Sequence, residues 1–379
     1  MPKVQPISGV TALDVAVIGG GLVGLAIAYG LQKLGAGVAV FDAGDHAQRA
    51  SGGNFALVWG QGKGVGASNY ARWTQTSLGL WTDFAEELED IAGLPLHYRN
   101  RGGFHFSFDQ MAFERRQALL AGQVSELGDD AYPFEMLSNE ELKRIFPALG
   151  PTVAGASFCS RDGDVNSLGL YRALIVALRK LGGLYLPGNP VAELKGNGDG
   201  FSIRAGAMRY KAGRVVVAAG LETGVIGKAV GLDIPVRPQT GQIIVTEKAA
   251  PFLPYPVSTI RQTNEGGVML GDSLEEKGRD DATTAGILSF TASRAVAAFP
   301  LIARLAVVRS WAALRVMTPD GLPIYRRSPA RPNAFACVCH SGVTLAAAHT
   351  QELARQIVAG SLSGLAASFD SARFDVQAA

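Results

Sequence analysis

Residues 13 to 26 read Leu13-Asp14-Val15-Ala16-Val17-Ile18-Gly19-Gly20-Gly21-Leu22-Val23-Gly24-Leu25-Ala26. An apolar, β-branched run ends in glycines, and an apolar pattern of helical period follows from residue 22 to about residue 34. This order predicts a strand, a tight turn and a helix N-terminus, the arrangement that binds a dinucleotide. Gly19 permits the turn, Gly21 lets a phosphate approach the backbone, and Gly24 lets the helix pack closely on the strand. We therefore predict a dinucleotide site that includes Leu22 and Val23.

A second apolar run, residues 37–41, ends in Asp42 and Ala43. An acid at this point, about twenty residues past the turn, accepts hydrogen bonds from a ribose hydroxyl. The ordered set of strand, glycines, helix, strand and acid is far more specific than the glycines alone. A signal sequence or membrane span over residues 15–31 is the alternative. It conflicts with Asp14, with the glycines, and with the lack of a basic region or cleavage site nearby.

Composition limits the class of protein. The chain has 379 residues, of which 18% are charged and 47% hydrophobic, which fits one large or two interleaved folded domains. The net charge is +2 without a long basic run, so composition gives no support for nucleic-acid or membrane-surface binding. The sparse, odd set of Cys159, Cys337 and Cys339 argues for a reducing cytoplasm and against a disulfide framework. With no matching Cys/His pair, we expect no metal site.

The pattern along the chain predicts an α/β fold in which a Rossmann-like domain is interleaved with a domain built on a mixed or antiparallel sheet. Residues 214–220 read as a buried parallel strand that meets a glycine turn, after short strands at 191–195, 201–205 and 208–211. Helices are predicted over 74–92, 110–127, 168–181, 282–298 and 344–358. We assign residues 10–75, 150–225 and 311–365 to the cofactor domain, and residues 76–149 and 226–310 to a substrate domain.

Three features favour a flavin over a nicotinamide. They are the small polar loop at residues 50–54, the late strand that ends at Gly220, and His340-Ser341-Gly342 before a helix. A helix N-terminus carries partial positive charge, which would stabilise the negative charge on a reduced flavin. Taken alone, the polar loop is equally compatible with a plain solvated segment.

These pieces, with residues 311–315 and the Thr318-Pro319-Asp320-Gly321-Leu322-Pro323 motif, resemble the FAD-dependent D-amino acid oxidase, glycine oxidase and sarcosine oxidase superfamily. The resemblance covers almost the whole chain. It implies non-covalent FAD and oxidation of the C–N bond of an amino acid by hydride transfer, followed by hydrolysis of the imine. Two positions depart from the usual pattern: Asp42 replaces the commoner Glu, and Gly53 stands where an arginine is frequent.

A narrower resemblance rests on residues 51–55, Val58-Trp59 and Gln61-Gly62-Lys63. This stretch is similar to the FAD-bearing subunit of bacterial opine or hydroxyproline dehydrogenases. That likeness implies a secondary amine, either N-alkylated or cyclic, as substrate. It also implies a hetero-oligomer in which oxygen or a partner subunit accepts the electrons.

The superfamily resemblance also implies the substrate contact. The arginine before Thr-Pro-Asp-Gly-Leu-Pro, here Arg315, binds the substrate carboxylate, and a guanidinium does so through two parallel charge-assisted bonds. Arg261 is a candidate second contact, although an exposed strand residue is an equal alternative. Lys63 could bind a second anion or activate oxygen, but a solvated loop lysine is the favoured interpretation. The predicted cofactor-binding residues are Gly19, Gly21, Leu22, Val23, Gly24, Asp42, Ala43, Ser51, Gly52, Asn54, Val191, Ala219, Gly220, Arg315, His340, Ser341, Gly342, Val343 and Thr344.

Two other functions remain open on the same fold. The first is oxidation of a 2-hydroxy acid, for which Arg315 would serve equally well. A pocket base for the hydroxyl proton would distinguish it. The second is an FAD subunit that relays electrons within a larger complex without its own substrate.

Overall fold

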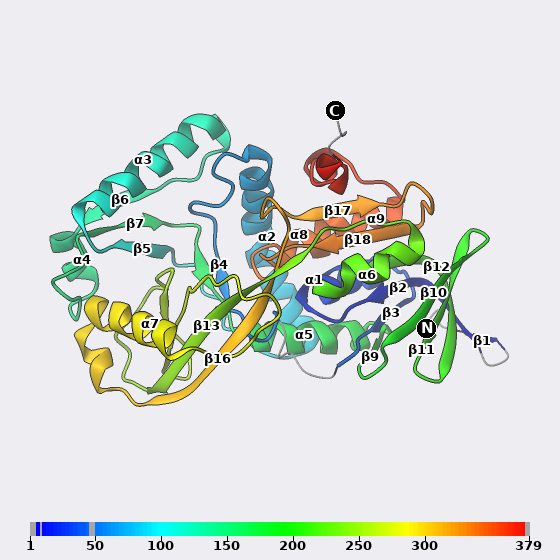
Figure 1. Cartoon of the computed structure of the whole chain (residues 1–379), viewed down its shortest axis with the longest axis horizontal. Coiled ribbons are helices and arrows are strands. Elements are labelled where there is room, and N and C mark those ends of the chain that lie inside the picture. Colours follow the sequence, from blue (N-terminus) through cyan, green and yellow to red (C-terminus); the bar gives the residue numbers. More distant parts are fainter. Residues whose placement is uncertain (1–4, 8–9, 45–49, 376–379) are drawn as a thin grey trace.

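The computed structural model describes residues 5–7, 10–44 and 50–375, so residues 45–49 of the polar segment after Asp42 lie outside the description. Two parts lie side by side (Figure 1). One part holds a large sheet together with both ends of the chain. The other holds smaller antiparallel sheets, and two long strands run from it toward the first part.

A parallel sheet forms the centre of the first part. β2 (Val10–Ile18) pairs with β3 (Val38–Phe41) on one side and with β12 (Met208–Val217) on the other. Outside these lie β9 (Leu184–Leu186) next to β3 and β18 (Ala334–Val338) next to β12, also parallel. The antiparallel strands are β1 (Gln5–Ile7) on β2, β17 (Ile324–Arg327) on β18, and the hairpin of β10 (Val191–Asn197) and β11 (Gly200–Ala205) on β12.

β12 differs from the prediction of two separate strands at 208–211 and 214–220. Its first half pairs antiparallel with β11 on one side, nearly its whole length runs parallel to β2 on the other, and residues 215–217 also pair in parallel with β18. One continuous strand therefore serves two kinds of pairing. The predicted parallel strand and the glycine turn after it are confirmed, since Gly220 has φ +60°.

Both faces of the large sheet are buried, which explains its continuous apolar runs. Val15 and Val17 face a layer of helices, while Ala16 and Ile18 face the hairpin side. The helical layer contains α1 (Leu22–Lys33), α2 (Ser68–Ala92), α5 (Ser167–Lys180), α8 (Ala346–Ala348), a π-helical turn (His349–Leu353) and α9 (Ala354–Ala359). Two short helices, α6 (Thr223–Gly227) and α10 (Gly364–Ala367), complete this part. Across the described ranges, no helix has both the length and the apolar character needed to cross a membrane.

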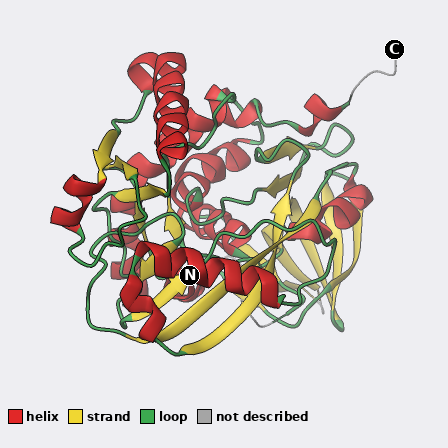
Figure 2. Cartoon of the chain, turned by 60° about the vertical axis from the view of Figure 1, so that its left-hand side comes forward, coloured by secondary structure: helices red, strands yellow, loops and turns green. Residues whose placement is uncertain are grey.

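The second part is built around two antiparallel sheets. One contains β5 (Gly103–Ser107), β7 (Gly155–Cys159) and β6 (Glu135–Ser138); the other contains β14 (Ile260–Gln262), β15 (Gly267–Leu270), β13 (Arg237–Lys248) and β16 (Val307–Met317). They meet where Phe104 pairs with Val257, in a core that includes Phe106, Phe146 and Phe299. Around them lie α3 (Gln110–Leu127), α4 (Asn139–Ile145) and α7 (Ala285–Ala298), which contacts β13 and lies across the long strands (Figure 2). β4 (Leu57–Val58) pairs with β8 (Gly163–Asp164).

Two stretches that the sequence division gives to the cofactor domain pair with strands of the second part. Residues 155–159 pair with β5, and residues 311–317 belong to β16, which pairs with β13. Hydrogen bonding between distant strands decides these pairings, and spacing along the chain does not encode them. The division of the chain into domains by residue range stays a prediction.

Gly24→Ala is expected to lower the free energy of unfolding by about 1–3 kcal/mol or more. A Cβ at Gly24 would lie 2.0 Å from the carbonyl oxygen of Gly19, so α1 and the turn would have to separate. Gly79→Ala is the matched control, because Gly79 also lies within a helix and its added Cβ meets nothing within 4 Å. Urea unfolding measures both variants. Equal stability of the two would remove close packing as the reason for glycine at position 24.

Candidate active site

A cavity of about 550 Å³, the first cavity, lies at the carboxyl ends of β2, β3, β12 and β18. In open α/β sheets this edge is where ligands bind. The structure brings most of the predicted cofactor residues to its wall, namely Gly19, Gly21, Leu22, Val23, Asp42, Ala43, Ser51, Asn54, Val191, Ala219, Gly220, His340, Gly342 and Val343.

The turn after β2 has the form that its glycines predict. Gly19 has φ +110°, and a Cβ there would lie 2.3 Å from the carbonyl oxygen of Ala218. The Asp42 carboxylate accepts a hydrogen bond from the backbone N–H of Gly20 at 2.6 Å. Ser51 Oγ accepts one from the N–H of Leu22 at 2.9 Å, so the polar loop closes over the first turn of α1.

The cavity wall fits a dinucleotide. Gly21, the residue before α1, supplies no side-chain cap, and the first amides of a helix favour a pyrophosphate. Asp42 provides the carboxylate suited to a ribose. Asn54 on the same wall has a buried side-chain oxygen, Oδ1, that has no hydrogen-bond partner among the described residues and so is an acceptor available to a ligand N–H.

The other predicted residues lie elsewhere. Gly24 packs behind the turn, and Gly52 lines neither the first cavity nor a second one beside it. Ser341, Thr344 and Arg315 line that second cavity. The predicted helix at 344–358 begins at residue 346, because residues 341–345 form a turn closed by the N–H of Leu345 on the carbonyl of Ser341 at 3.0 Å.

This second cavity has a volume of about 340 Å³ and adjoins the first. The two cavities share Ala50, Asn54, Ala313, Leu314, Val316, Cys339, His340 and Val343. The charged residues on the wall of the second cavity are Lys63, Arg315 and Asp272. Across the described residues, no group of three or more His, Cys, Asp and Glu side chains is arranged to hold a metal ion.

Arg315 is held in place by backbone groups. It lies on β16 opposite Gln239 of β13, and its guanidinium covers Gly241, where a Cβ would lie 2.5 Å from Nη1. Nη1 donates to the carbonyl oxygen of Ser273 at 2.6 Å, while the nearest Asp272 oxygen is 4.0 Å from Nη2. Burial lowers the pKa of Arg315, and the negative charge of Asp272 opposes this shift. The group remains a cation on the cavity wall.

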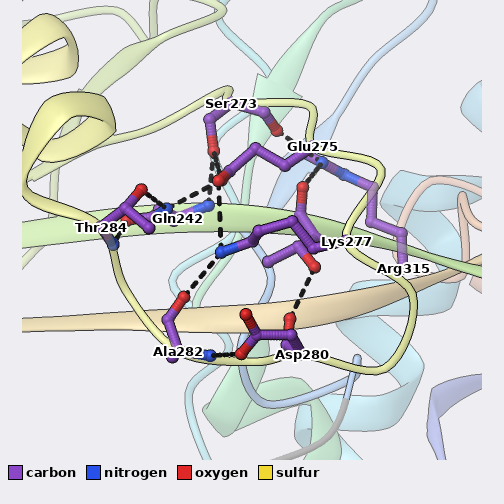
Figure 3. A network of polar contacts seen from close by, with 9 residues as sticks. Gln242, Ser273, Glu275, Lys277, Asp280, Ala282, Thr284 and Arg315 are labelled. Carbon is purple, nitrogen blue, oxygen red and sulfur yellow. Dashed lines mark hydrogen bonds and ion pairs between the residues drawn. The ribbon is translucent and has the colours of Figure 1, made fainter.

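The segment 272–284 that supplies the Ser273 carbonyl is fastened to β13 by Gln242 (Figure 3). The Gln242 side chain donates to Glu275 at 2.8 Å and to Thr284 at 2.9 Å, so it joins both ends of the segment. Gln242 is 1% exposed. Sequence reasoning missed this residue, although a glutamine within the apolar strand 241–245 was a usable signal.

Lys63 is not the solvated loop residue that the sequence favoured. Its ammonium donates to Ser341 Oγ at 2.7 Å and lies 3.4 Å from His340 Nε2. Burial lowers the pKa of Lys63 to about 8, so the side chain is still mainly protonated at neutral pH. Desolvation by the surrounding protein, with the nearby charges of Lys63 and Arg315, lowers the pKa of His340 to about 3. The imidazole is therefore neutral.

The family-wide pattern described as DAO, FAD dependent oxidoreductase, matches residues 14–356. The chain belongs to this family of FAD-dependent oxidoreductases. A protein of Rhizobium meliloti named as a subunit of opine oxidase is 39% identical over 97% of this chain and 99% of its own length, and the Agrobacterium tumefaciens protein of the same name is 40% identical over the same shares. The fold matches the crystal structure of glycine oxidase from Geobacillus kaustophilus with a TM-score of 0.86, at 24% identity over 97% of this chain and 99% of that one.

As a member of the family, the protein uses FAD, and the first cavity has the residues to hold it. The amides at the start of α1 suit the pyrophosphate, and the Asp42 carboxylate suits the ribose. Arg279 also lines this cavity, in an ion pair with Glu222 at 2.7 Å. Arg279 was not among the predicted residues, because it comes from the segment 272–284, far along the chain from the glycine turn.

Arg261, the second substrate contact proposed from the sequence, lines neither cavity. It is 5% exposed, and its Nη1 lies 3.1 Å from Oδ2 of the buried Asp164. Arg99 pairs with the same carboxylate at 2.6 Å. The Arg261 guanidinium stacks behind Phe55, which does line the second cavity. Its position is that of a buried ion pair behind the cavity wall.

Arg261→Met is expected to lower the free energy of unfolding by about 1–3 kcal/mol, because Asp164 loses one charged partner and keeps Arg99. The amount of FAD bound per chain stays unchanged, since the first cavity is not altered. Urea unfolding and the visible absorbance of the purified protein measure the two effects. Unchanged stability combined with a loss of substrate affinity would instead support the contact proposed from the sequence.

Proposed function

We propose that this flavoprotein oxidises the C–N bond of an amino acid, and in particular of an amino acid with a substituent on nitrogen. The observation that carries the proposal is the fixed, cationic Arg315 in a cavity that adjoins the dinucleotide cavity. A guanidinium binds a carboxylate through parallel charge-assisted bonds and so fixes the orientation of the whole molecule. Orientation against the redox partner supplies much of the rate enhancement that this reaction requires.

The reaction balances with two electrons. The carbon next to nitrogen gives up a hydride equivalent, the nitrogen lone pair forms the C=N bond, and the nitrogen releases a proton. Water then hydrolyses the imine to a carbonyl compound and an amine. Bound flavin supplies the two-electron acceptor for this oxidation. Arg315 binds the carboxylate, and the apolar side chains of Leu314 and Val316 on the shared wall limit access of water.

The protonation states around the cavity favour an amine over a 2-hydroxy acid. A hydroxy acid needs a base for its hydroxyl proton, whereas a free amine expels the hydride with its own lone pair. His340, with a pKa of about 3, is a poor base, and burial raises the pKa of the Cys339 thiol to about 12. His340 and Cys339 are therefore unsuited to accept a hydroxyl proton, which favours a substrate that binds with a neutral amine nitrogen.

We also propose that the chain acts within a multi-subunit enzyme on opine-type substrates, with FAD bound non-covalently. The two relatives near 40% identity are each named as a subunit of an opine oxidase, and each is matched over nearly its whole length. Oxygen or a partner subunit would then accept the electrons. A pure electron relay is the less favoured alternative, since it gives no reason for a fixed guanidinium beside the dinucleotide cavity.

Arg315→Ala is expected to raise the KM for the amine substrate by about two orders of magnitude, because two charge-assisted bonds are lost. Arg315→Lys recovers part of the affinity, since an ammonium offers a point charge without the planar fork. Anaerobic bleaching of the flavin by a panel of amino acids, N-methyl amino acids, proline analogues and opines measures the effect. Arg309→Ala is the control, because Arg309 is an exposed residue of the same strand.

No bleaching by any amine or hydroxy acid, with the natural sequence and any co-purifying subunit present, would support the electron relay. Bleaching with an unchanged KM in Arg315→Ala would keep the enzyme and remove this residue from its substrate site.

A further inference from the structure

The function proposed above assigns no role to Lys63, a charged residue on the wall of the second cavity. Lys63 Nζ meets a serine hydroxyl, Ser341 Oγ, and the neutral imidazole of His340. The carboxylates of Asp162 and Asp272 act on the ammonium through space only. Because an ammonium has three N–H donors, one of them remains for a ligand in the cavity.

The backbone around Lys63 is fixed by side chains from distant segments. Asp162 and Tyr132 accept the N–H groups of residues 60 and 62, at 2.5 and 2.6 Å, and Gln123 of α3 donates to the carbonyl oxygen of Lys63. Asp162 and Tyr132 are themselves buried. A loop lysine that contacts only solvent does not require its backbone to be fixed by such hydrogen bonds, whereas a residue that binds a ligand must be held in position.

The charges on the cavity wall do not balance. Lys63 and Arg315 are cations, and each lowers the pKa of His340, so both act on the same space. Among the described residues of the wall, the one carboxylate is that of Asp272, whose side chain is 50% exposed to solvent and whose Oδ1 lies 4.0 Å from Arg315 Nη2. A substrate with a single carboxylate would use Arg315 and leave the Lys63 ammonium partly desolvated without a counter-ion, which is unfavourable.

We propose that Lys63 binds a second carboxylate of the substrate, and that the enzyme prefers secondary amines with a carboxylate on each side of the nitrogen. The proposal rests on the proposed function in one respect, because Arg315 is taken to bind the first carboxylate. N-carboxyalkyl amino acids are the chemical class with this pattern. With the nitrogen neutral, as the proposed function requires, their two carboxylates give two negative charges, one for each of the cations Lys63 and Arg315.

Two inert ligands test the inference without turnover. Glutarate and butyrate share one carboxylate and the three-carbon chain attached to it, and glutarate carries a second carboxylate in place of one hydrogen of the terminal methyl group of butyrate. Their dissociation constants for the FAD-loaded full chain, with any co-purifying subunit, are measured by titration calorimetry or by the change in the flavin spectrum. The natural sequence is expected to bind glutarate more tightly than butyrate.

Lys63→Met is expected to weaken glutarate binding by about 10- to 100-fold, the effect of one charge-assisted bond, and to leave butyrate binding within about twofold. Lys63→Arg keeps most of the preference because it keeps the charge. Lys211→Met is the control, since Lys211 is an exposed residue of β12. Arg315→Ala weakens both ligands. Equal binding of the two ligands by the natural sequence, or equal losses for both in Lys63→Met, would overturn the proposal.

The pH dependence gives a second readout, because neither ligand titrates above pH 7. The pKa of Lys63 is about 8, so glutarate affinity falls above pH 8 by up to about tenfold per pH unit until it reaches that of Lys63→Met. Butyrate affinity does not follow this titration. The other groups around Lys63 do not titrate in this window: His340 is neutral, the Cys339 thiol has a pKa of about 12, burial raises the pKa of Tyr70 still further, and Arg315 stays charged. Asp162, with its pKa raised to about 7 by burial, is largely ionised above pH 8.

Turnover separates failure of this inference from failure of the proposed function. Iminodiacetate and N-methylglycine are both secondary amines, and they differ in one carboxylate. The expected kcat/KM ratio favours iminodiacetate in the natural sequence and falls toward one in Lys63→Met. A large, equal loss with both amines would overturn the inference by making Lys63 a general proton acceptor. Glutarate preference that depends on Lys63 but comes with no flavin bleaching by any amine would support the anion site and count against amine oxidation.

Discussion

The approach of helix α1 to strand β2 is the constraint on which the rest of the molecule depends. A Cβ at Gly24 would lie 2.0 Å from the Gly19 carbonyl oxygen, so helix and turn meet at backbone distance. This approach brings the first amides of α1 to the carboxyl edge of the sheet, where Asp42 accepts the N–H of Gly20 and Ser51 accepts that of Leu22. The groups that hold the cofactor are therefore fixed by the backbone of the turn.

A second constraint connects that edge of the sheet to the second cavity. β16 runs along β13 over most of its length, and its far half carries Ala313, Leu314, Arg315 and Val316 to the junction of the two cavities. Arg315 points over Gly241, which has no side chain to block it, and is held by the carbonyl of Ser273. The segment 272–284 is fastened by Gln242 at both ends. The cation beside the cofactor cavity is thus positioned by strand register and by carbonyl groups.

The sequence predicted correctly the features that depend on residues close together in the chain. The turn at residues 19–24 and the acid at the end of β3 depend on neighbours in the chain, and both occur where the pattern indicated. The position of a side chain that depends on contacts with distant segments could not be predicted. Arg261 sits in a strand that reads like an exposed one, yet the buried Asp164 and Met269 enclose it. The sheet to which residues 155–159 belong was equally hidden, because their partner β5 comes 48 or more residues earlier.

The surroundings of Lys63, like those of Arg261, could not be predicted from the sequence. In the sequence Lys63 lies between Gly62 and Gly64 in a loop, a local pattern that favours a solvent-exposed side chain. Its position follows from Gln123 on α3, Tyr132 and Asp162, three contacts that form only when the second part of the molecule closes on the loop. The two cations of the second cavity therefore lie on different kinds of segment. Arg315 lies on a strand that its sequence motif identifies, and Lys63 lies in a loop that tertiary contacts position. In the proposed function the strand motif supplies one carboxylate contact, so discrimination between substrates with one and two carboxylates would depend on the loop that contains Lys63, whose position no local sequence pattern indicates.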